Sequence, residues 1–88
     1  MSYDVAWSAS AKRAIGRLPE KAATAIVEYI YAVIAENPRR AGHPLHFELE
    51  GTYSARRADF RVIYEIHADT STISIVTIGH RSDVYRSR

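Results

Sequence analysis

The sequence predicts an α+β fold in which two helices precede a small antiparallel sheet. Apolar residues recur at helical spacing between residues 11 and 34, which indicates amphipathic helices. Between residues 53 and 80 the chain is rich in β-branched and aromatic residues with a two-residue period, which indicates strands. The two patterns occupy separate parts of the chain, and helices segregated from an antiparallel sheet define the α+β class.

The N-terminal half is predicted to contain one strand and a helical hairpin. Residues 3–7 alternate in polarity and indicate the strand. Ser8 or Ser10 can cap a first helix, which ends at Pro19. A second helix follows almost directly and ends at the Asn-Pro pair at 37–38, so the two helices form a hairpin. The apolar stripe of the second helix is Ala23, Ile26, Ile30, Val33 and Ile34.

The C-terminal half is predicted to be a basic loop followed by a three-stranded meander. Residues 39–44 combine arginines with a glycine and a proline and indicate the loop, while residues 45–49 fit either an extended segment or a turn. The three strands are expected at 53–57, 60–67 and 72–80, joined by tight turns. The helices are expected to cover one face of this sheet.

Size and composition restrict the possible functions. A chain of 88 residues makes a single domain, expected to span 1–88. The absence of cysteine excludes disulfides, thiolate nucleophiles and zinc–thiolate sites. The N-terminus lacks the features of a signal peptide and no apolar run is long enough to cross a membrane, so a cytoplasmic location without membrane contact is expected.

Strand alternation predicts where the arginines point. One face of the strand at 60–67 is wholly apolar and must pack against the helices, which turns Arg61 to the opposite face. That apolar face consists of Phe60, Val62, Tyr64 and Ile66. One of Arg56 and Arg57 must share the side of Arg61, because neighbours in a strand alternate.

The last strand is expected to add a further arginine to the same face. Arg81 has the parity of Ile73, Ile75, Thr77 and Gly79. Tyr85 lies just beyond it. A basic face with an aromatic residue at its rim is typical of a protein that binds a phosphate backbone. The alternative is a solvated surface on which these arginines pair with acidic side chains, and the excess of ten arginines over two lysines is equally typical of a GC-rich genome.

Histidine acid–base catalysis is the other chemistry that the sequence suggests. His43 and His46 lie in and just after the basic loop and can reach the sheet rim, and His46, Arg39 and Arg40 are further candidates for contact with the phosphate backbone. His80 has the opposite parity to Arg81 and is expected to face the helices or an edge. No pair of histidines has metal-ligand spacing with a third donor, so neither a metal nor another cofactor is expected.

Three stretches of the chain resemble the RelE family of bacterial toxin–antitoxin modules. They are 51–57 (Gly-Thr-Tyr-Ser-Ala-Arg-Arg), 60–64 (Phe-Arg-Val-Ile-Tyr) and 79–86 (Gly-His-Arg-Ser-Asp-Val-Tyr-Arg). The Arg-Leu-Pro at 17–19, the Asn-Pro at 37–38 and the spacing from Pro44 to Gly51 also fit. The resemblance covers essentially the whole chain.

The resemblance implies a toxin that cleaves messenger RNA in the ribosomal A site without a metal, through attack by the substrate's own 2′-hydroxyl. On that pattern Arg61 stabilises the charge on the phosphate, Arg81 assists the leaving group, and Tyr85 takes the 2′-hydroxyl proton or stacks on a base. Arg56 matches a position that is commonly lysine, whereas a second such lysine is replaced by Ser54. Arg57 is a further RNA-binding candidate.

The resemblance also implies a partner and leaves two alternatives open. The expected partner is a cognate antitoxin of the RelB or Phd kind, bound in a hetero-oligomer through an acidic segment that folds on the basic face. ParE-type toxins share the architecture but poison DNA gyrase, and an inert module that acts only as a corepressor with its antitoxin is the third possibility.

Overall fold

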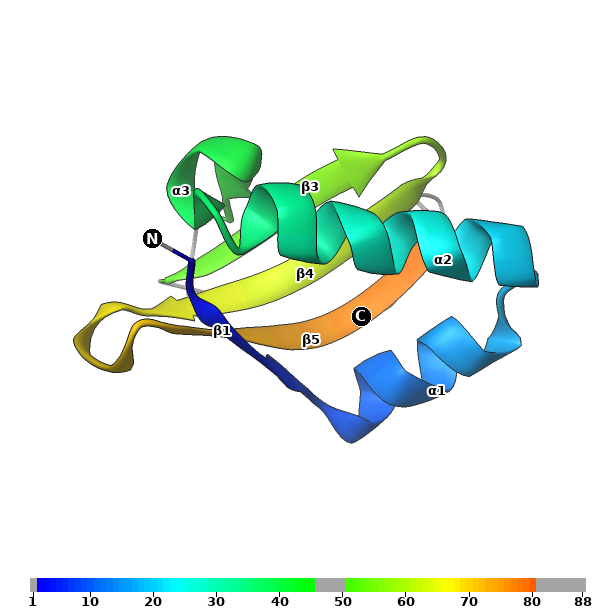
Figure 1. Ribbon diagram of the computed structural model, residues 1–88, viewed down its shortest axis with the longest axis horizontal. Helices are drawn as coiled ribbons and strands as arrows, with labels where there is room; N and C mark the ends of the chain where they lie inside the picture. Colours follow the sequence, from blue (N-terminus) through cyan, green and yellow to red (C-terminus); the bar gives the residue numbers. More distant parts are fainter. Residues whose placement is uncertain (1, 46–50, 81–88) are drawn as a thin grey trace.

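The computed structural model describes residues 2–45 and 51–80 and confirms the α+β class (Figure 1). Helices and strands follow one another in the predicted order, with a short helix and a two-residue strand added before the meander. The elements are β1 Asp4–Trp7, α1 Ala9–Arg17, α2 Glu20–Tyr29, the π-helix η1 Ile30–Ile34, α3 Pro38–Ala41, β2 His43–Pro44, β3 Thr52–Arg57, β4 Phe60–His67, the 3₁₀ turn η2 Ala68–Thr70 and β5 Thr72–His80.

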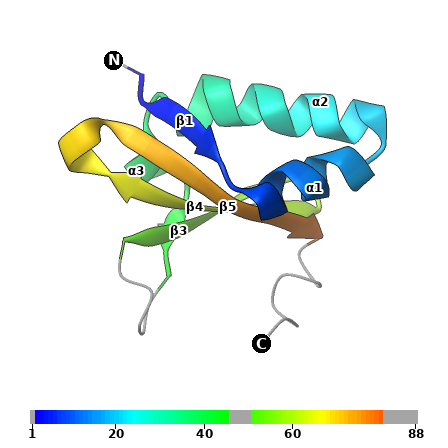
Figure 2. The ribbon, with the colours of Figure 1, turned by 90° about the horizontal axis from the view of Figure 1, so that it is seen from below.

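The strands form one five-stranded mixed sheet in the order β1-β5-β4-β3-β2. The predicted meander, β3 to β5, is antiparallel throughout. β1 extends it as a parallel partner of β5, and β2 extends the opposite edge as an antiparallel partner of β3. Figure 2 shows β1 leading directly into α1, while α2 crosses the same side of the sheet.

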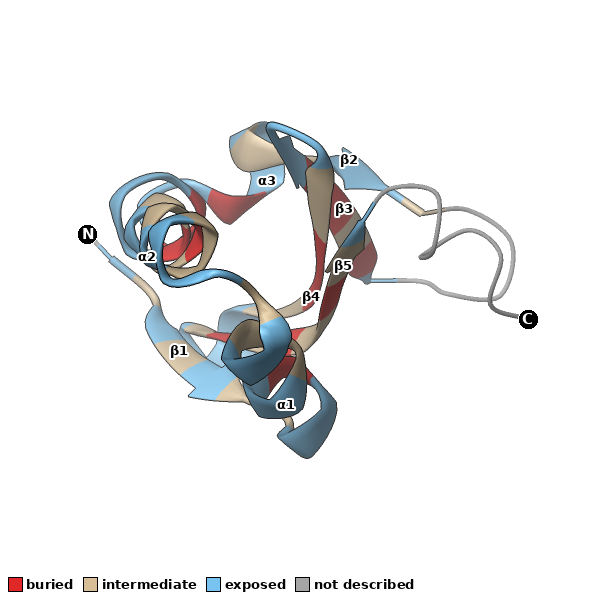
Figure 3. Cartoon of the chain, turned by 90° about the vertical axis from the view of Figure 1, so that its right-hand side faces the viewer, coloured by how far each residue is buried: buried red, intermediate tan, exposed pale blue. Residues whose placement is uncertain are grey.

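The helices cover one face of the sheet, and the core lies between the two layers (Figure 3). The largest fully buried side chains come from both layers: Ile26, Ile30 and Ile34 from the helices, and Val62, Tyr64, Ile73 and Ile75 from the strands. Phe60 and Ile66 pack against this cluster, so the apolar face assigned to β4 from its alternation is confirmed. The opposite face of β3, β4 and β5, here called the open face, carries no helix within the described residues.

Ser8 is the residue that caps α1, which decides between the two predicted serines. Its Oγ accepts a hydrogen bond from the backbone N–H of Ala11 at 3.0 Å and donates one to the carbonyl of Val76 at 2.6 Å. The cap therefore both starts the helix and ties it to β5. Ser10 lies further along α1, where its hydroxyl bonds to that of Thr77 at 3.2 Å.

A π-turn changes the face that the end of the second helix buries. In η1 the backbone N–H of Ala35 donates to the carbonyl of Ile30, five residues earlier, at 2.8 Å. The extra residue in this turn rotates the next side chains about the helix axis, so Ile34 and Ala35 are buried while Val33 is 41% exposed. The prediction that Val33 belongs to the apolar stripe was wrong, because it assumed an uninterrupted 3.6-residue period.

The segment predicted as a basic loop begins with a helix. The preceding helix ends at Ile34, and Pro38 is the first residue of α3, where its missing N–H costs no hydrogen bond. After Gly42 the chain enters β2 and pairs with β3. The loop prediction was therefore wrong for most of residues 39–44, because a single turn of helix and a two-residue strand are too short to produce a period.

Candidate active site

The pairing of β3 with β4 places two arginines next to each other on the open face. Arg56 lies opposite Arg61, whereas Arg57 lies opposite Phe60, whose ring packs against the core on the helical side. Arg56 is thus the strand neighbour that shares a side with Arg61, which sequence alternation could not decide. Across the other strand, Gly79 of β5 lies opposite Arg61, so a residue without a side chain adjoins the arginine.

The two arginines line a cavity of about 400 Å³ on this face. The described residues around it come from the end of α3 and from β2, β3 and β4: Ala41, Gly42, His43, Ser54, Arg56 and Arg61. Two guanidinium groups offer planar, permanently charged donors that match the oxygens of a phosphate. The cavity is within the size range of sites that take small ligands or one nucleotide unit.

The wall of the cavity is held by a close contact between Gly42 and β3. A Cβ atom on Gly42 would lie 2.5 Å from the carbonyl oxygen of Ser54 and 2.8 Å from the hydroxyl of Tyr64. Only glycine fits at this approach. The Tyr64 hydroxyl also donates to the carbonyl of Pro38 at 2.6 Å, and that of Tyr29 donates to the carbonyl of Ala41 at 3.5 Å. Two core tyrosines therefore fix α3, and with it the Gly42–His43 wall.

Arg56 and Ser54 present polar groups from the same strand. The Nε of Arg56 donates to the carbonyl of Ala58 at 3.4 Å, a long contact that turns the side chain toward the β3–β4 connection. Ser54, two residues earlier on the same face, is 4% exposed, and its hydroxyl has no hydrogen-bond partner among the described residues. His43 lies opposite Ser54 in the β2–β3 register and is exposed. The site thus combines two cations, one buried hydroxyl and one imidazole.

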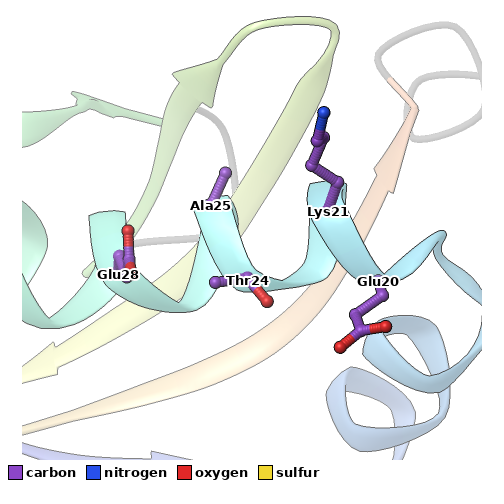
Figure 4. Close-up of a pocket in the computed structure, with 5 residues that line it drawn as sticks. All are labelled: Glu20, Lys21, Thr24, Ala25 and Glu28. Carbon is purple, nitrogen blue, oxygen red and sulfur yellow. The ribbon is translucent and has the colours of Figure 1, made fainter.

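A larger hollow, of about 640 Å³, lies on the outer side of α2 and differs in chemistry (Figure 4). All its lining residues belong to one helix, α2, between Glu20 and Glu28, and the side chains of Glu20 and Lys21 project from this helix in opposite directions. Side chains on the surface of a single helix diverge, so they do not point together at one ligand. The candidate site is therefore the smaller cavity, where residues of four elements meet and where β3 and β4 each supply an arginine.

Comparison with known proteins decides the family. The model for the ParE toxin of type II toxin–antitoxin systems (parDE) matches residues 5–85. Toxin RelE of Mycobacterium tuberculosis is 46% identical over 84 residues, which cover 96% of this chain and 87% of the relative. Toxin RelG of the same organism is 38% identical over 86 residues, with 98% and 99% coverage. The chain belongs to the RelE/ParE family of type II toxins.

Solved structures of the family agree with the fold. The RelBE2 toxin–antitoxin complex of M. tuberculosis contains a chain that superposes with a TM-score of 0.87 at 36% identity, with 92% of this chain and all of that one covered. A mutant of Escherichia coli RelE in the free state superposes with a TM-score of 0.79 at 17% identity, covering 98% and 93%. At that identity the likeness concerns the RelE-like fold alone.

The toxin brings together some of the predicted site residues and separates others. Arg56 and Arg61 share the cavity. Arg57 lies on the helical side, close enough to Tyr29 that its charge opposes the rise which burial produces in the pKa of that phenol. Arg39 is directed away, since it donates to the hydroxyl of Tyr3 at 3.4 Å, and Arg40 is an exposed residue of α3. The three remaining candidates lie outside the described residues: Arg81, Tyr85 and His46.

A β-bulge corrects the parity used for the last strand of the toxin. Ile63 lies opposite Thr77 and Tyr64 opposite Ile75, so Val76 has no partner in β4. Before the bulge, Ile73 and Ile75 face the core and are fully buried; after it, Thr77 and Gly79 fall on the side of Ile63 and Arg61. The prediction that all four residues share one face was wrong. The bulge nevertheless leaves Gly79 on the face expected for it.

His80 lies where its parity indicated. Its Cα is opposite that of Phe60, and its ring meets the Phe60 ring edge-on with centroids 6.0 Å apart. This histidine is therefore at the helical side of the strand end, apart from the arginine pair.

Three residues of the cavity were not among the site candidates chosen from the sequence. In the sequence Ser54 is only a departure from a lysine, and His46 rather than His43 is the histidine expected near the RNA. Ser54 and His43 meet the arginines because β2 pairs with β3, an interaction of only two residues that no periodic pattern reveals. Gly42 carried a usable signal, since an isolated glycine before an extended segment often marks a close backbone approach.

The described residues contain no group of three or more metal-ligating side chains, and none of their helices has the length and hydropathy needed to span a membrane.

Proposed function

We propose that this toxin is a metal-independent, ribosome-dependent endoribonuclease that cleaves messenger RNA and so inhibits translation. The observation that carries the proposal is the pair Arg56 and Arg61, opposite each other on the open face and lining one cavity. The names of the two mycobacterial relatives, both called toxins of the Rel type, support it.

The chemistry needs positive charge and proton transfer. The 2′-oxygen of a ribose attacks the adjacent phosphorus while the P–O5′ bond breaks, which leaves a 2′,3′-cyclic phosphate and a 5′-hydroxyl. The 2′-hydroxyl proton passes to a base, and a proton is delivered to the leaving 5′-oxygen. The extra negative charge of the pentavalent state makes the largest contribution to the activation barrier. Preorganised cations stabilise this negative charge directly. Guanidinium groups can supply the positive charge that stabilises this state, so the reaction needs no metal ion.

Each candidate residue is given a role in this scheme. Arg61 stabilises the charge on the phosphate oxygens, and Arg56 binds the backbone beside it. Arg81 assists departure of the 5′-oxygen, and Tyr85 accepts the 2′-hydroxyl proton or stacks on a base. The ribosome supplies substrate positioning, because the described cavity presents few groups that read a base.

A cognate antitoxin is the proposed partner. Solved relatives include toxin–antitoxin complexes named RelBE from M. tuberculosis and E. coli. An acidic antitoxin segment that folds on the open face would cover both arginines and place carboxylates where the RNA phosphate binds. The proposal therefore includes a hetero-oligomer of toxin and antitoxin in which the toxin is inactive.

Primer extension on translated messages, after induction of the toxin, tests the activity. The wild type is expected to produce cuts in register with codons. Arg61→Ala, which removes a charge that faces the transition state, should reduce these cuts by about 10²-fold or more, and Tyr85→Phe should reduce them if that hydroxyl transfers a proton. Circular dichroism of each variant shows whether its fold is intact. Undiminished cleavage by a folded Arg61→Ala variant would remove the proposed site from the chemistry.

A gyrase poison of the same fold is the second candidate, because the matching family model is that of ParE toxins. The same induced cells separate the two activities. DNA breaks trapped on gyrase without codon-register cuts would establish the ParE-like activity, and neither product would indicate an inert partner of the antitoxin.

A further inference from the structure

We propose that the buried hydroxyl of Ser54 is a phosphate-oxygen donor at the base of the Arg56–Arg61 cavity. The inference rests on the proposed function, since it adds a substrate contact to the same site.

The first argument is the state of the hydroxyl. Ser54 is 4% exposed, and its Oγ is shielded from solvent without a hydrogen-bond partner among the described residues. Such a group costs about 1–3 kcal/mol relative to a satisfied one, so folding alone gives no reason for a serine here. Alanine would fill nearly the same volume without that cost. A ligand that accepts the hydrogen bond would compensate for it.

The second argument is the neighbourhood. Across the sheet the residues opposite Ser54 are His43 on β2 and Ile63 on β4, and the isoleucine offers no polar atom. Arg56 is on the same face two residues away, and Arg61 lines the same cavity. Any acceptor that reaches Ser54 through the cavity must pass these cations, which selects an anion. An RNA phosphate, with two non-bridging oxygens, can bind an arginine and the hydroxyl together.

The third argument is rigidity. Gly42 approaches the carbonyl of Ser54 so closely that a Cβ atom would collide with it, and Tyr64 fixes the segment before Gly42. The backbone of Ser54 is therefore clamped between β2 and β4, and the hydroxyl has few positions. A donor held in place before the substrate arrives stabilises charge without a reorganisation cost. Arg56, which borders it, is exposed, and the rotamers of exposed side chains exchange in picoseconds to nanoseconds, which gives an anion access.

Ser54→Ala tests the proposal through two properties that should change in opposite directions. Removal of an unsatisfied buried hydroxyl should leave the thermal midpoint unchanged or raise it. The same change should weaken binding of inorganic phosphate, measured by calorimetry with the purified toxin, about tenfold, as expected for loss of one hydrogen bond to a charged group. Messenger RNA cleavage should fall by a similar factor.

Ser74→Ala is the matched control. Ser74 is also a serine of the sheet, but its hydroxyl lies 3.0 Å from Nε2 of His67 and it does not line the cavity. This variant should bind phosphate as the wild type does. Equal phosphate affinity of Ser54→Ala and the wild type, or a loss of stability in Ser54→Ala without a loss of affinity, would overturn the proposal.

Two further readouts separate this inference from the proposed nuclease function. Phosphate binding that depends on Ser54, in a toxin that makes no codon-register cuts, would support the subsite and reject the nuclease. Codon-register cleavage by a toxin whose phosphate binding does not depend on Ser54 would support the nuclease and reject the subsite. If Ser54→Ala does not fold, phosphate titration of the wild type followed by amide NMR decides, because the Ser54 and Gly42 signals must shift and those of Ser74 must not.

Discussion

At the scale of single residues, Tyr64 connects the core to the candidate site. Its side chain is fully buried and stacks on Tyr53 with ring centroids 5.8 Å apart, while its hydroxyl reaches the carbonyl of Pro38. The hydroxyl thus donates a hydrogen bond to the first residue of α3, and this contact supports the Gly42–His43 wall. Its place on the apolar face of β4 was predictable from alternation, but the partner of its hydroxyl was not.

Tyr64→Phe is expected to lower the free energy of unfolding by about 1–3 kcal/mol, because the Pro38 carbonyl loses its donor inside the protein. Urea denaturation measures the change. Tyr31→Phe is the matched control, since the Tyr31 hydroxyl accepts a bond from Trp7 Nε1 on a side chain that is 49% exposed. Equal effects of the two substitutions would show that the Pro38 contact does not stabilise the fold.

The same phenol predicts how stability depends on pH. Burial raises the pKa of Tyr64 well above its ordinary value near 10, with smaller contributions from Tyr29 and Tyr53. Above that ordinary value the unfolded chain releases the phenol proton while the folded chain retains it, so the unfolding free energy falls as pH rises and is unaffected by this group below it. Urea titrations between about pH 8 and 11 should show this decline, and Tyr64→Phe should make it shallower. A pH dependence identical to that of the wild type would contradict the assignment.

At the scale of elements, the π-turn η1 decides which side chains close the core. An uninterrupted helix would have buried both Val33 and Ile34, but in the turn closed by the hydrogen bond from Ala35 to Ile30 the buried pair is Ile34 and Ala35, and Val33 is exposed. The two neighbours Val33 and Ile34 are both branched aliphatic residues, and nothing in their identities separates them. The difference comes from one hydrogen bond that spans five residues rather than four.

Ile34→Ala should therefore lower the free energy of unfolding by about 2–5 kcal/mol, the usual cost of truncating a buried isoleucine. Val33→Ala, on an exposed position of the same turn, should change it by less than about 0.5 kcal/mol. Chemical denaturation of both variants measures the two changes. A larger loss of unfolding free energy in Val33→Ala than in Ile34→Ala would indicate that Val33 is the buried residue, as in an uninterrupted helix.

At the scale of the whole molecule, the sheet divides the basic residues between two environments. One face of β3–β5 packs against α1 and α2 (Figure 3). The other presents Arg56 and Arg61. Consecutive arginines in one strand thus have different surroundings: Arg56 borders the cavity, and Arg57 lies against α2 with Ala25 and Phe60. A net charge of +2 gives no hint of this separation, because position rather than total charge creates the site.

Arg56→Ala should accordingly reduce codon-register cleavage by about tenfold more than Arg57→Ala, although both remove the same charge from the same strand. Reporter messages in a purified translation system, at two salt concentrations, provide the measurement. The salt dependence of RNA binding should weaken in Arg56→Ala, because one phosphate contact is lost. A larger loss of cleavage in Arg57→Ala than in Arg56→Ala would indicate that the RNA binds on the helical side of the sheet.

The sequence by itself determined the class of fold, the order of the main elements and the face of Arg61, because these follow from periodicities that extend over six or more residues. Its motifs also indicated the family, which the comparisons confirmed. The tertiary structure decided the rest: which arginine accompanies Arg61, the placing of Val33 outside, and the union of Gly42, His43 and Ser54 with the arginines. The choice of Arg56 depends on the register between β3 and β4, which alternation within one strand does not fix. The other two depend on a π-turn and a two-residue strand, which are too short to leave a periodic trace but change which side chains meet.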